Sequence, residues 1–256
     1  MRTAAVISAA LLVLLTVGCG VVEEAGKSAV QKGDCLTQEG TEFKKVDCGG
    51  AAYVVVGRAG TGQPQKGCID VAGTQYVYYE DGSDVCVGTK GADHASAVNV
   101  AQVGECLTEA SGDPKRVECT DPTARYRILA RETASTIGPD MACQKVSGTE
   151  RSYTFLLKTT AGIGKGLGSG IAFCLAGKDT DTSKTVDNAK KGSCLQKTGS
   201  NTMTIVDCAS PEADYKVLLS GMDQSWCNPV SGVIATYSFK RPGEIFTTYL
   251  CLGSPR

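Results

Sequence analysis

Short runs in which apolar and polar residues alternate recur along the chain, and turn-forming residues separate them. In the run that starts at Tyr126, an extended chain places Tyr126, Ile128 and Ala130 on one face and the intervening residues on the other. Similar runs start at Tyr53 and Tyr215. A period of two over a few residues is typical of strands with one buried face, so the pattern predicts a series of short β-strands.

Polar stretches that favour turns lie between many of these runs, for example residues 39–41 and 112–114. Two short strands around such a stretch form a β-hairpin. Segments 139–143 and 222–227, which each end in a cysteine, instead favour a short helical turn, and two closing strands follow each of them. We therefore predict a mainly β fold, α+β at most, with short helical turns.

The same arrangement occurs three times along the chain. Twelve cysteines form three groups of four, with gaps of 13, 20 and 18, then 13, 24 and 31, then 14, 19 and 24 residues: Cys35, Cys48, Cys68 and Cys86; Cys106, Cys119, Cys143 and Cys174; Cys194, Cys208, Cys227 and Cys251. Each group opens with Gly-x-Cys-Leu, and a tyrosine follows its third cysteine by ten residues. Agreement at so many points indicates internal duplication.

The repeat predicts three small, disulfide-stapled, β-rich domains in tandem, over residues 33–88, 104–177 and 192–256. The segments between them, 87–103 and 175–191, are rich in Gly, Ala, Asp, Thr and Lys, as linkers are. We expect the ends of these linkers to join the unit that follows.

The first residues of the chain are typical of an export signal. Arg2 is followed by an uncharged stretch over residues 4–17, which is too short to span a bilayer. Cys19 follows the stretch as the cysteine of a bacterial lipobox would, although Thr16 replaces the usual aliphatic residue. We predict that residues 1–18 are removed, that Cys19 carries lipid, and that residues 19–32 form a tether. The alternative is an ordinary secreted protein cut near Gly18.

Export places the twelve cysteines in an oxidising compartment, where they are expected to form structural disulfides. Four cysteines per unit allow three pairings. The first two cysteines of a unit lie near facing positions at the open end of a hairpin, within disulfide reach. We predict that the first cysteine pairs with the second and the third with the fourth: Cys35–Cys48, Cys68–Cys86, Cys106–Cys119, Cys143–Cys174, Cys194–Cys208 and Cys227–Cys251.

Motifs for catalysis and metal binding do not stand out in the sequence. No CxxC pair occurs, and the single histidine, His94, lies in a linker, so we expect neither a metal site nor a cofactor. GxSxG and HExxH are absent, and we predict no enzymatic activity. In the glycine-rich segment 162–170, Gly166 follows Lys165 where a phosphate loop needs Ser or Thr, so an enlarged hairpin loop is predicted. A formal net charge of −1 argues against nucleic acid as a partner.

Three tyrosines in the first unit form a candidate contact surface. Tyr76, Tyr78 and Tyr79 lie in one predicted strand, so Tyr76 and Tyr78 share a face and Tyr79 lies on the other. Such tyrosines are usually core on one face, and on the other face they can bind a partner.

The repeating pattern GDCL…VDC…AxYxV…C…Y…CL resembles the LppU-type lipoproteins of actinobacteria, which are small exported domains with four cysteines. The resemblance covers nearly all of residues 33–253, counted as three copies. It implies the architecture, a lipid anchor, and a place on the extracytoplasmic face of an actinobacterial cell membrane. It implies no catalytic residues and no particular biochemical role.

Two classes of function follow from these observations. The first is a non-enzymatic binding or adaptor module of the cell envelope, whose tandem units gain affinity from being linked. The second is a structural scaffold lipoprotein that holds a membrane assembly. A hydrolase with a site between units is a third reading, which would require a cleft there. The partner, whether a ligand or an envelope protein, is not identified by the sequence.

Overall fold

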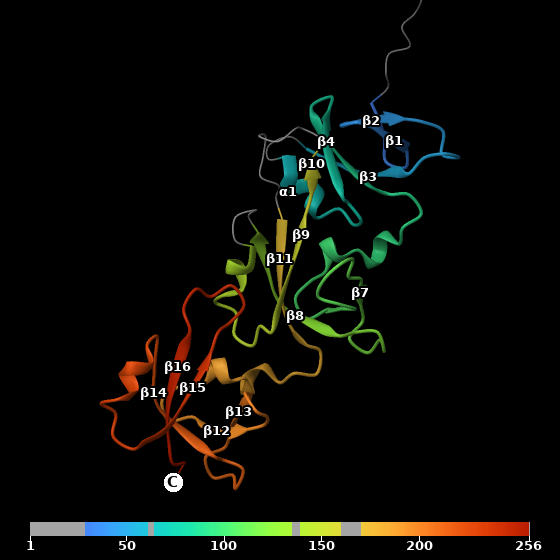
Figure 1. Ribbon diagram of the computed structural model, residues 1–256. Helices are drawn as coiled ribbons and strands as arrows, with labels where there is room; N and C mark the ends of the chain where they lie inside the picture. Colours follow the sequence, from blue (N-terminus) through green and yellow to red (C-terminus); the bar gives the residue numbers. More distant parts are fainter. Residues whose placement is uncertain (1–28, 61–63, 135–138, 160–169, 256) are drawn as a thin grey trace, which may run out of the picture.

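The computed structural model describes residues 29–60, 64–134, 139–159 and 170–255 of the chain (Figure 1). Three β-sheets follow one another along an elongated molecule, with the first unit at one end and the C-terminus at the other. The predicted mainly β fold class is confirmed, because the described helical segments are short.

The three units share one order of elements. The first contains β1 (Cys35–Glu39), β2 (Glu42–Lys45), β3 (Tyr53–Ala59), α1 (Pro64–Ile69), β4 (Tyr76–Glu80) and β5 (Ser83–Thr89). The second contains β6 (Cys106–Leu107), β7 (Arg116–Val117), β8 (Tyr126–Ala134), η3 (Pro139–Cys143), β9 (Arg151–Leu156), β10 (Lys158–Thr159) and β11 (Gly170–Gly177). The third contains β12 (Cys194–Lys197), β13 (Met203–Val206), β14 (Tyr215–Gly221), η6 (Gln224–Cys227), β15 (Val233–Phe239) and β16 (Thr248–Gly253).

Each sheet has the strand of the fourth cysteine near its centre. In the third unit the order is β13-β12-β14-β16-β15, and the second unit follows the same plan as β7-β6-β8-β11-β9. The first sheet has the corresponding order plus one more strand, β10-β4-β5-β3-β1-β2. All pairings within a repeat are antiparallel, as expected of hairpins joined by short connections.

The Gly-x-Cys-Leu motif opens each core. The leucine of the motif is fully buried in all three units, at Leu36, Leu107 and Leu195. The glycine two residues before the cysteine has a positive φ in every copy, +95° at Gly33, for example, a conformation that favours glycine. The motif therefore combines a turn, a disulfide and a core side chain at the start of each sheet.

Two disulfides staple each unit at different places. The first pair closes the mouth of the opening hairpin, with Cα atoms 5.0–5.1 Å apart: Cys35–Cys48, Cys106–Cys119 and Cys194–Cys208. The second pair ties the helical turn to the fourth-cysteine strand, with Cα atoms 5.3–5.4 Å apart: Cys68–Cys86, Cys143–Cys174 and Cys227–Cys251. These are the pairs that the hairpin argument predicts.

The connecting segments are docked structures, whereas the sequence suggested linkers joined to the next unit. The first holds η1 (His94–Ser96) and η2 (Val98–Val100), and the second holds η4 (Thr182–Lys184) and η5 (Val186–Asn188). Each does form one bridge with the hairpin of the following unit. In addition, Asn99 Oδ1 accepts the Gly73 N–H at 3.1 Å, and Asp187 Oδ2 accepts the Gly148 N–H at 2.7 Å. Each connector is therefore fixed to the unit before it as well.

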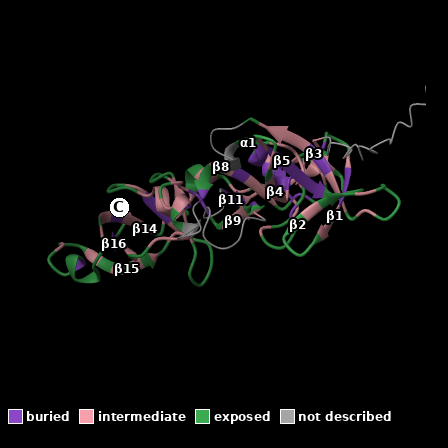
Figure 2. Ribbon diagram, turned by 90° about the horizontal axis from the view of Figure 1, so that it is seen from above, coloured by how far each residue is buried: buried purple, intermediate pink, exposed green. Residues whose placement is uncertain are grey.

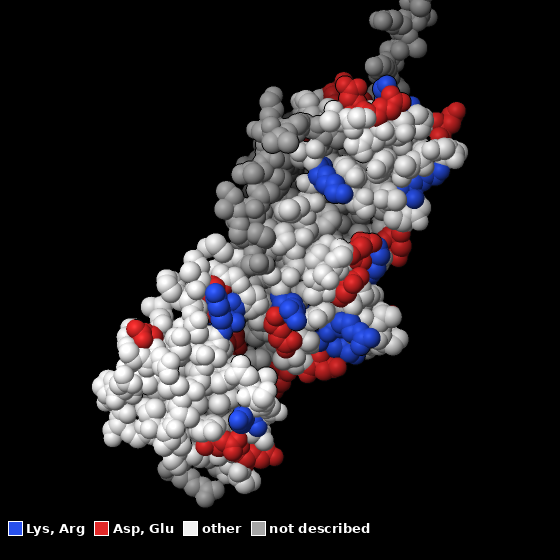
Figure 3. Space-filling model, viewed as in Figure 1, with Lys and Arg blue, Asp and Glu red and all other residues white. Residues whose placement is uncertain are grey.

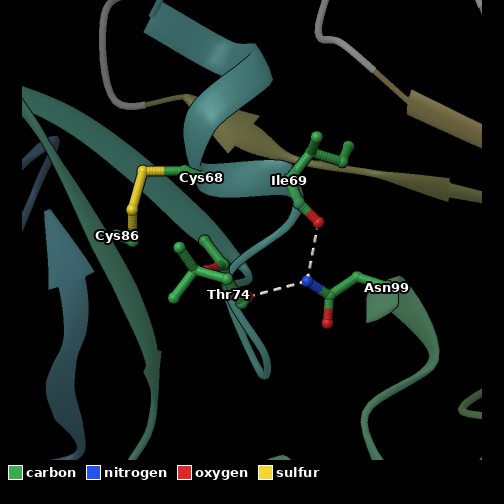
Figure 4. Close-up of a disulfide and its surroundings, with 6 residues drawn as sticks. Cys68, Ile69, Thr74, Cys86 and Asn99 are labelled. Carbon is green, nitrogen blue, oxygen red and sulfur yellow. Dashed lines mark hydrogen bonds between the residues drawn. A yellow bond between two sulfur atoms is a disulfide. The ribbon is translucent and has the colours of Figure 1, made fainter. Parts of the chain in front are cut away.

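Figure 4 shows further hydrogen bonds that the Asn99 side chain makes. The Asn99 side chain reaches the turn after α1, beside the Cys68–Cys86 disulfide. Its Nδ2 donates to the Ile69 carbonyl at 2.9 Å and to the Val71 carbonyl at 2.8 Å. Asn99 is buried, and both the oxygen and the nitrogen of its side-chain amide are hydrogen-bonded. It therefore fixes the connector to the first unit.

The first and second units are merged. Strand β10 of the second repeat pairs in parallel with β4, so it extends the first sheet. Leu157, just before β10, is buried in one hydrophobic cluster with Val77 and Cys68 of the first unit and Phe173 of the second. The repeat boundaries divide the sequence, but the first sheet and its core cross them.

Candidate binding surface on the third unit

Strand β15 forms one edge of the third sheet, and β13 forms the other. Strand β15 is the last strand in the order β13-β12-β14-β16-β15, and no backbone partner lies on its outer side among the described residues. Its sequence, Val-Ile-Ala-Thr-Tyr-Ser-Phe, contains no charge and no proline. Natural edge strands usually carry Lys, Pro or a short length that prevents pairing with other chains. Strand β15 has seven residues and lacks the first two of these protections.

The two faces of β15 differ sharply. Tyr237 and Phe239 pack on the core of the third unit, while Ile234 on the opposite face is 65% exposed. Gln224 Nε2 donates to Thr236 Oγ1 at 3.4 Å, which links η6 to this outer face. The outer face of β15 and the turn η6 therefore form one continuous surface.

Two more exposed apolar side chains lie beside η6, toward β14. Met222 is 61% exposed and Trp226, within η6, is 48% exposed. Asp223 caps η6, because its Oδ1 accepts the Ser225 N–H at 2.8 Å. The Trp226 ring lies directly over Gly221, where an added Cβ would come within 2.2 Å of the ring. Gly221 ends β14, and β16 lies between β14 and β15, so Met222 and Trp226 lie apart from the β15 edge. We call Ile234 and the free edge of β15 the β15 face.

Electrostatics around the β15 face are weak. The third unit presents a broad uncharged area at the lower left of Figure 3, while charged side chains gather along the other side of the molecule. Hydrogen bonds from the Ser225 backbone and side chain lower the pKa of Asp223, so this carboxylate is ionised at neutral pH and occupied by its own cap. Burial raises the pKa of Tyr237, which keeps this phenol neutral. The arrangement suits apolar and backbone contacts better than the recognition of a charged ligand.

The tyrosines proposed from the sequence separate between two faces of β4. Tyr76 and Tyr78 are half-buried and pack with Phe43 and Tyr53, with ring centroids 5.3–5.6 Å apart. Burial raises the pKa of Tyr78 far above its usual range. Tyr79, on the other face, is 66% exposed. Two of the three tyrosines, Tyr76 and Tyr78, therefore belong to a core cluster. A contact role for Tyr79 stays a prediction.

His94 fills a structural position. Its ring packs on Gly73, where an added Cβ would lie 2.0 Å from Nδ1. The cavity beside it, lined also by Asp93, Asp113 and Lys115, has a volume of about 50 Å³. Ligand sites usually enclose about 300 Å³ or more, so this cavity has room for water but not for a substrate.

Two features singled out in the sequence fall outside the part of the chain that the structure describes. Cys19 and most of the glycine-rich segment, residues 160–169, fall outside the described residues. Within the described part of the chain, no group of three or more His, Cys, Asp or Glu residues is placed to hold a metal ion. No helix among the same residues has the length and apolar character to cross a membrane.

Comparison of the chain with protein-family models, with curated proteins and with solved structures gives no match. The candidate surface therefore depends on the geometry of this molecule and on the comparison of its own three repeats.

The β15 face was not among the sites predicted from the sequence. Its signal was nevertheless present, because β15 is an uncharged alternating run. What the sequence could not supply is the knowledge that β15 is an edge strand with its outer face uncovered.

Proposed function

We propose that this protein is an extracytoplasmic, lipid-anchored adaptor of the LppU type, which binds a protein partner through its third unit. The observation that carries this proposal is the β15 face, an exposed apolar surface beside an unprotected sheet edge. Six disulfides are typical of proteins outside the cytosol. Exposed apolar patches of this kind mark interaction sites.

The long axis of the molecule supports this arrangement. The described chain begins in the first unit, at one end, and the third unit lies at the opposite end (Figure 1). Val30 is buried in the core of the first unit, so with lipid on Cys19 the tether would comprise residues 20–28 and span roughly 15–18 Å. The first unit would then lie near the membrane and the third unit away from it, where the β15 face can meet a partner.

A structural scaffold is the second candidate, and the joins between units favour it. Arg131 Nη2 lies 2.6 Å from Asp70 Oδ1 across the first join, and Arg241 Nε lies 3.1 Å from Asp187 Oδ2 across the second. Such joins suit a rigid spacer. A scaffold would bind its assembly along several units, whereas an adaptor would bind through the β15 face alone.

Site-specific cross-linking in living cells separates these two functions. A photo-reactive phenylalanine analogue replaces Ile234 in one strain, Ser200 of the same unit in a second, and Tyr79 of the first unit in a third. An adaptor gives a discrete adduct from position 234 and none from position 200. Equal adducts from positions 79 and 234 would favour the scaffold, and the lack of an adduct at position 234 would contradict the adaptor.

The anchor is tested separately. Cys19→Ser removes the thiol that would carry lipid, so we expect loss of fatty-acid labelling and a shift of the protein from the membrane fraction to the medium. Cys119→Ser is not a suitable control because it breaks a disulfide, so Ser28→Ala within the tether serves instead. Retention of label in the Cys19→Ser protein would contradict the anchor.

A further inference from the structure

We infer that the β15 face receives an extended segment of a partner protein, which adds to the edge of the third sheet as a parallel strand. This inference rests on the proposed adaptor function and names the form of its ligand. The argument comes from the first unit, where the equivalent edge is already occupied by another part of the same chain.

Strand β10 is the occupant of that equivalent edge. It runs parallel to β4, with Lys158 opposite Tyr76 and Thr159 opposite Val77, and the Lys158 N–H donates to the Gln75 carbonyl at 2.9 Å. Leu157, which precedes it, is 3% exposed. The pairing involves only two residues of each strand, yet it covers the edge of β4 with backbone hydrogen bonds and one buried aliphatic side chain. Strand addition of this kind is a common mode of peptide recognition.

The register of the disulfide strands shows that β15 is the equivalent of β4. Val77 lies opposite Cys86 in the first sheet, and Thr236 lies opposite Cys251 in the third. Tyr76 therefore corresponds to Ala235, and the residue before it, Gln75, corresponds to Ile234. A strand added to β15 in the same manner would lie beside Ala235 and Thr236, with its aliphatic residue next to Ile234.

The helical turns beside the two edges are also equivalent. Gly67 precedes Cys68 in α1, and Trp226 precedes Cys227 in η6. Gly67 sits close against Ala59, since an added Cβ would approach the Ala59 Cβ at 2.3 Å, whereas Trp226 sits over Gly221. The third unit has thus exchanged a small residue for an indole at its helical turn. The indole lies over β14, which β16 separates from β15, so it leaves the β15 edge itself uncovered.

The occupied edge also defines what the ligand must contain. The Leu157 position calls for an aliphatic side chain that packs between Ile234 and η6. Lys158 Nζ lies 5.1 Å from the centre of the Tyr76 ring, but Ala235 replaces that ring in the third unit. A cation at the following position therefore has no equivalent partner. The ligand is an extended, uncharged segment with an aliphatic residue, in keeping with the uncharged sequence of β15.

A segment of another protein fits better than a second copy of this chain. The one segment of this chain shown to occupy such an edge, Leu157 with β10, is held on its own first unit. Exchange between two copies would leave the first sheet open. The β15 edge therefore calls for a donor outside the chain.

A synthetic peptide that copies residues 153–160 with Lys158→Gln, and with blocked ends, is the probe, and the full exported chain is the receptor. The control peptide carries Leu157→Asp and Lys158→Pro, which remove the aliphatic contact and one backbone donor. Amide hydrogen exchange across β15 reports binding. We expect the probe at about 1 mM to slow exchange in β15, and the control peptide to leave it unchanged.

Variants of the receptor locate the site. Ile234→Lys places a charge on the edge and should weaken binding of the probe about tenfold or more, while Ser200→Lys in the same unit should leave it unchanged. Near-ultraviolet circular dichroism shows that both variants keep the fold. Exchange protection confined to β4, no protection at about 1 mM probe, or equal binding by both variants would overturn the inference. A dimer in sedimentation that Ile234→Lys dissociates would also overturn it, because the occupant would then be a second copy.

The outcome for the adaptor function stays separate. An adduct from position 234 in cells, together with no effect of the peptide, would leave the adaptor standing and would show that its partner binds by another geometry. Loss of the cellular adduct, together with protection of β15 by the peptide, would contradict the adaptor function instead.

Discussion

Asp84 is a buried carboxylate near the start of β5. It lies opposite Ala59 and Tyr79 in the neighbouring strands, and its Oδ2 has no hydrogen-bond partner among the described residues. Desolvation by burial raises the pKa of this carboxyl. Because the folded-state pKa is higher than the unfolded one, the native state disfavours the ionised form. The cost to folding is present at neutral pH and disappears as pH falls below the unfolded value of about 3.9.

Replacing Asp84 by Asn tests this reasoning. The change removes the charge but keeps the shape, so we expect the free energy of unfolding to rise by about 1 kcal/mol at pH 7. At about pH 3 the wild-type carboxyl is neutral, and the difference between the two proteins should vanish. Urea unfolding of both proteins at the two pH values measures it. A gain that is equal at both values would rule out the charge as its cause.

At the scale of elements, the local pairs were the predictable part of this fold. Cys35 and Cys48 are 13 residues apart around a turn, so a hairpin brings them together and the sequence suffices to pair them. Strand β10 is different, because two residues carry no periodic signal and their partner, β4, lies about eighty residues earlier. Asn99 likewise lies in a segment with the composition of a linker, and only the structure shows that its side chain binds the turn after α1.

The two classes of disulfide should differ in their resistance to reduction. Cys48 and Cys208, at the hairpin mouths, are exposed, whereas Cys68, Cys86 and Cys143 are fully buried. Attack by a thiolate requires access to a sulfur atom, so the hairpin bridges should open first. Mild reduction without denaturant, followed by alkylation and peptide mapping, should label the first and second cysteines of each unit before the third and fourth. Equal labelling of both classes would show that exposure does not control the rate.

At the scale of the whole molecule, the two joins between units differ in kind. The first is a shared core and a shared sheet, while the second depends on a polar cluster around Asp187, which is 8% exposed at its side chain. Arg241 Nη2 donates to the Asp187 carbonyl at 2.7 Å, and Arg241 Nη1 lies 3.1 Å from Glu244 Oε1. Gln144 Nε2 also donates to the Gly243 carbonyl across this join. We expect the first two units to unfold together and the third to respond separately to changes in this cluster.

Arg241→Ala should loosen the third unit. The change leaves the Asp187 carboxylate buried without its cation, which costs about 2–4 kcal/mol at a site of this kind. We expect faster amide exchange at Gly148 and a larger radius of gyration in X-ray scattering. Lys184→Ala is the matched control, because its pair with Asp181 is exposed on both sides and such pairs contribute little. An unchanged radius of gyration in the Arg241→Ala protein would contradict this account of the second join.

The order of the disulfides has a consequence for how the protein is made. Every bridge joins a cysteine to the next cysteine of its unit, and no bridge encloses another cysteine. During translocation from the N-terminus, each pair is therefore complete before the next cysteine emerges. An oxidase that simply joins cysteines in order of arrival would produce the native set, with no need for a later isomerisation step. The connectivity of this molecule is thus the one that vectorial export generates by itself.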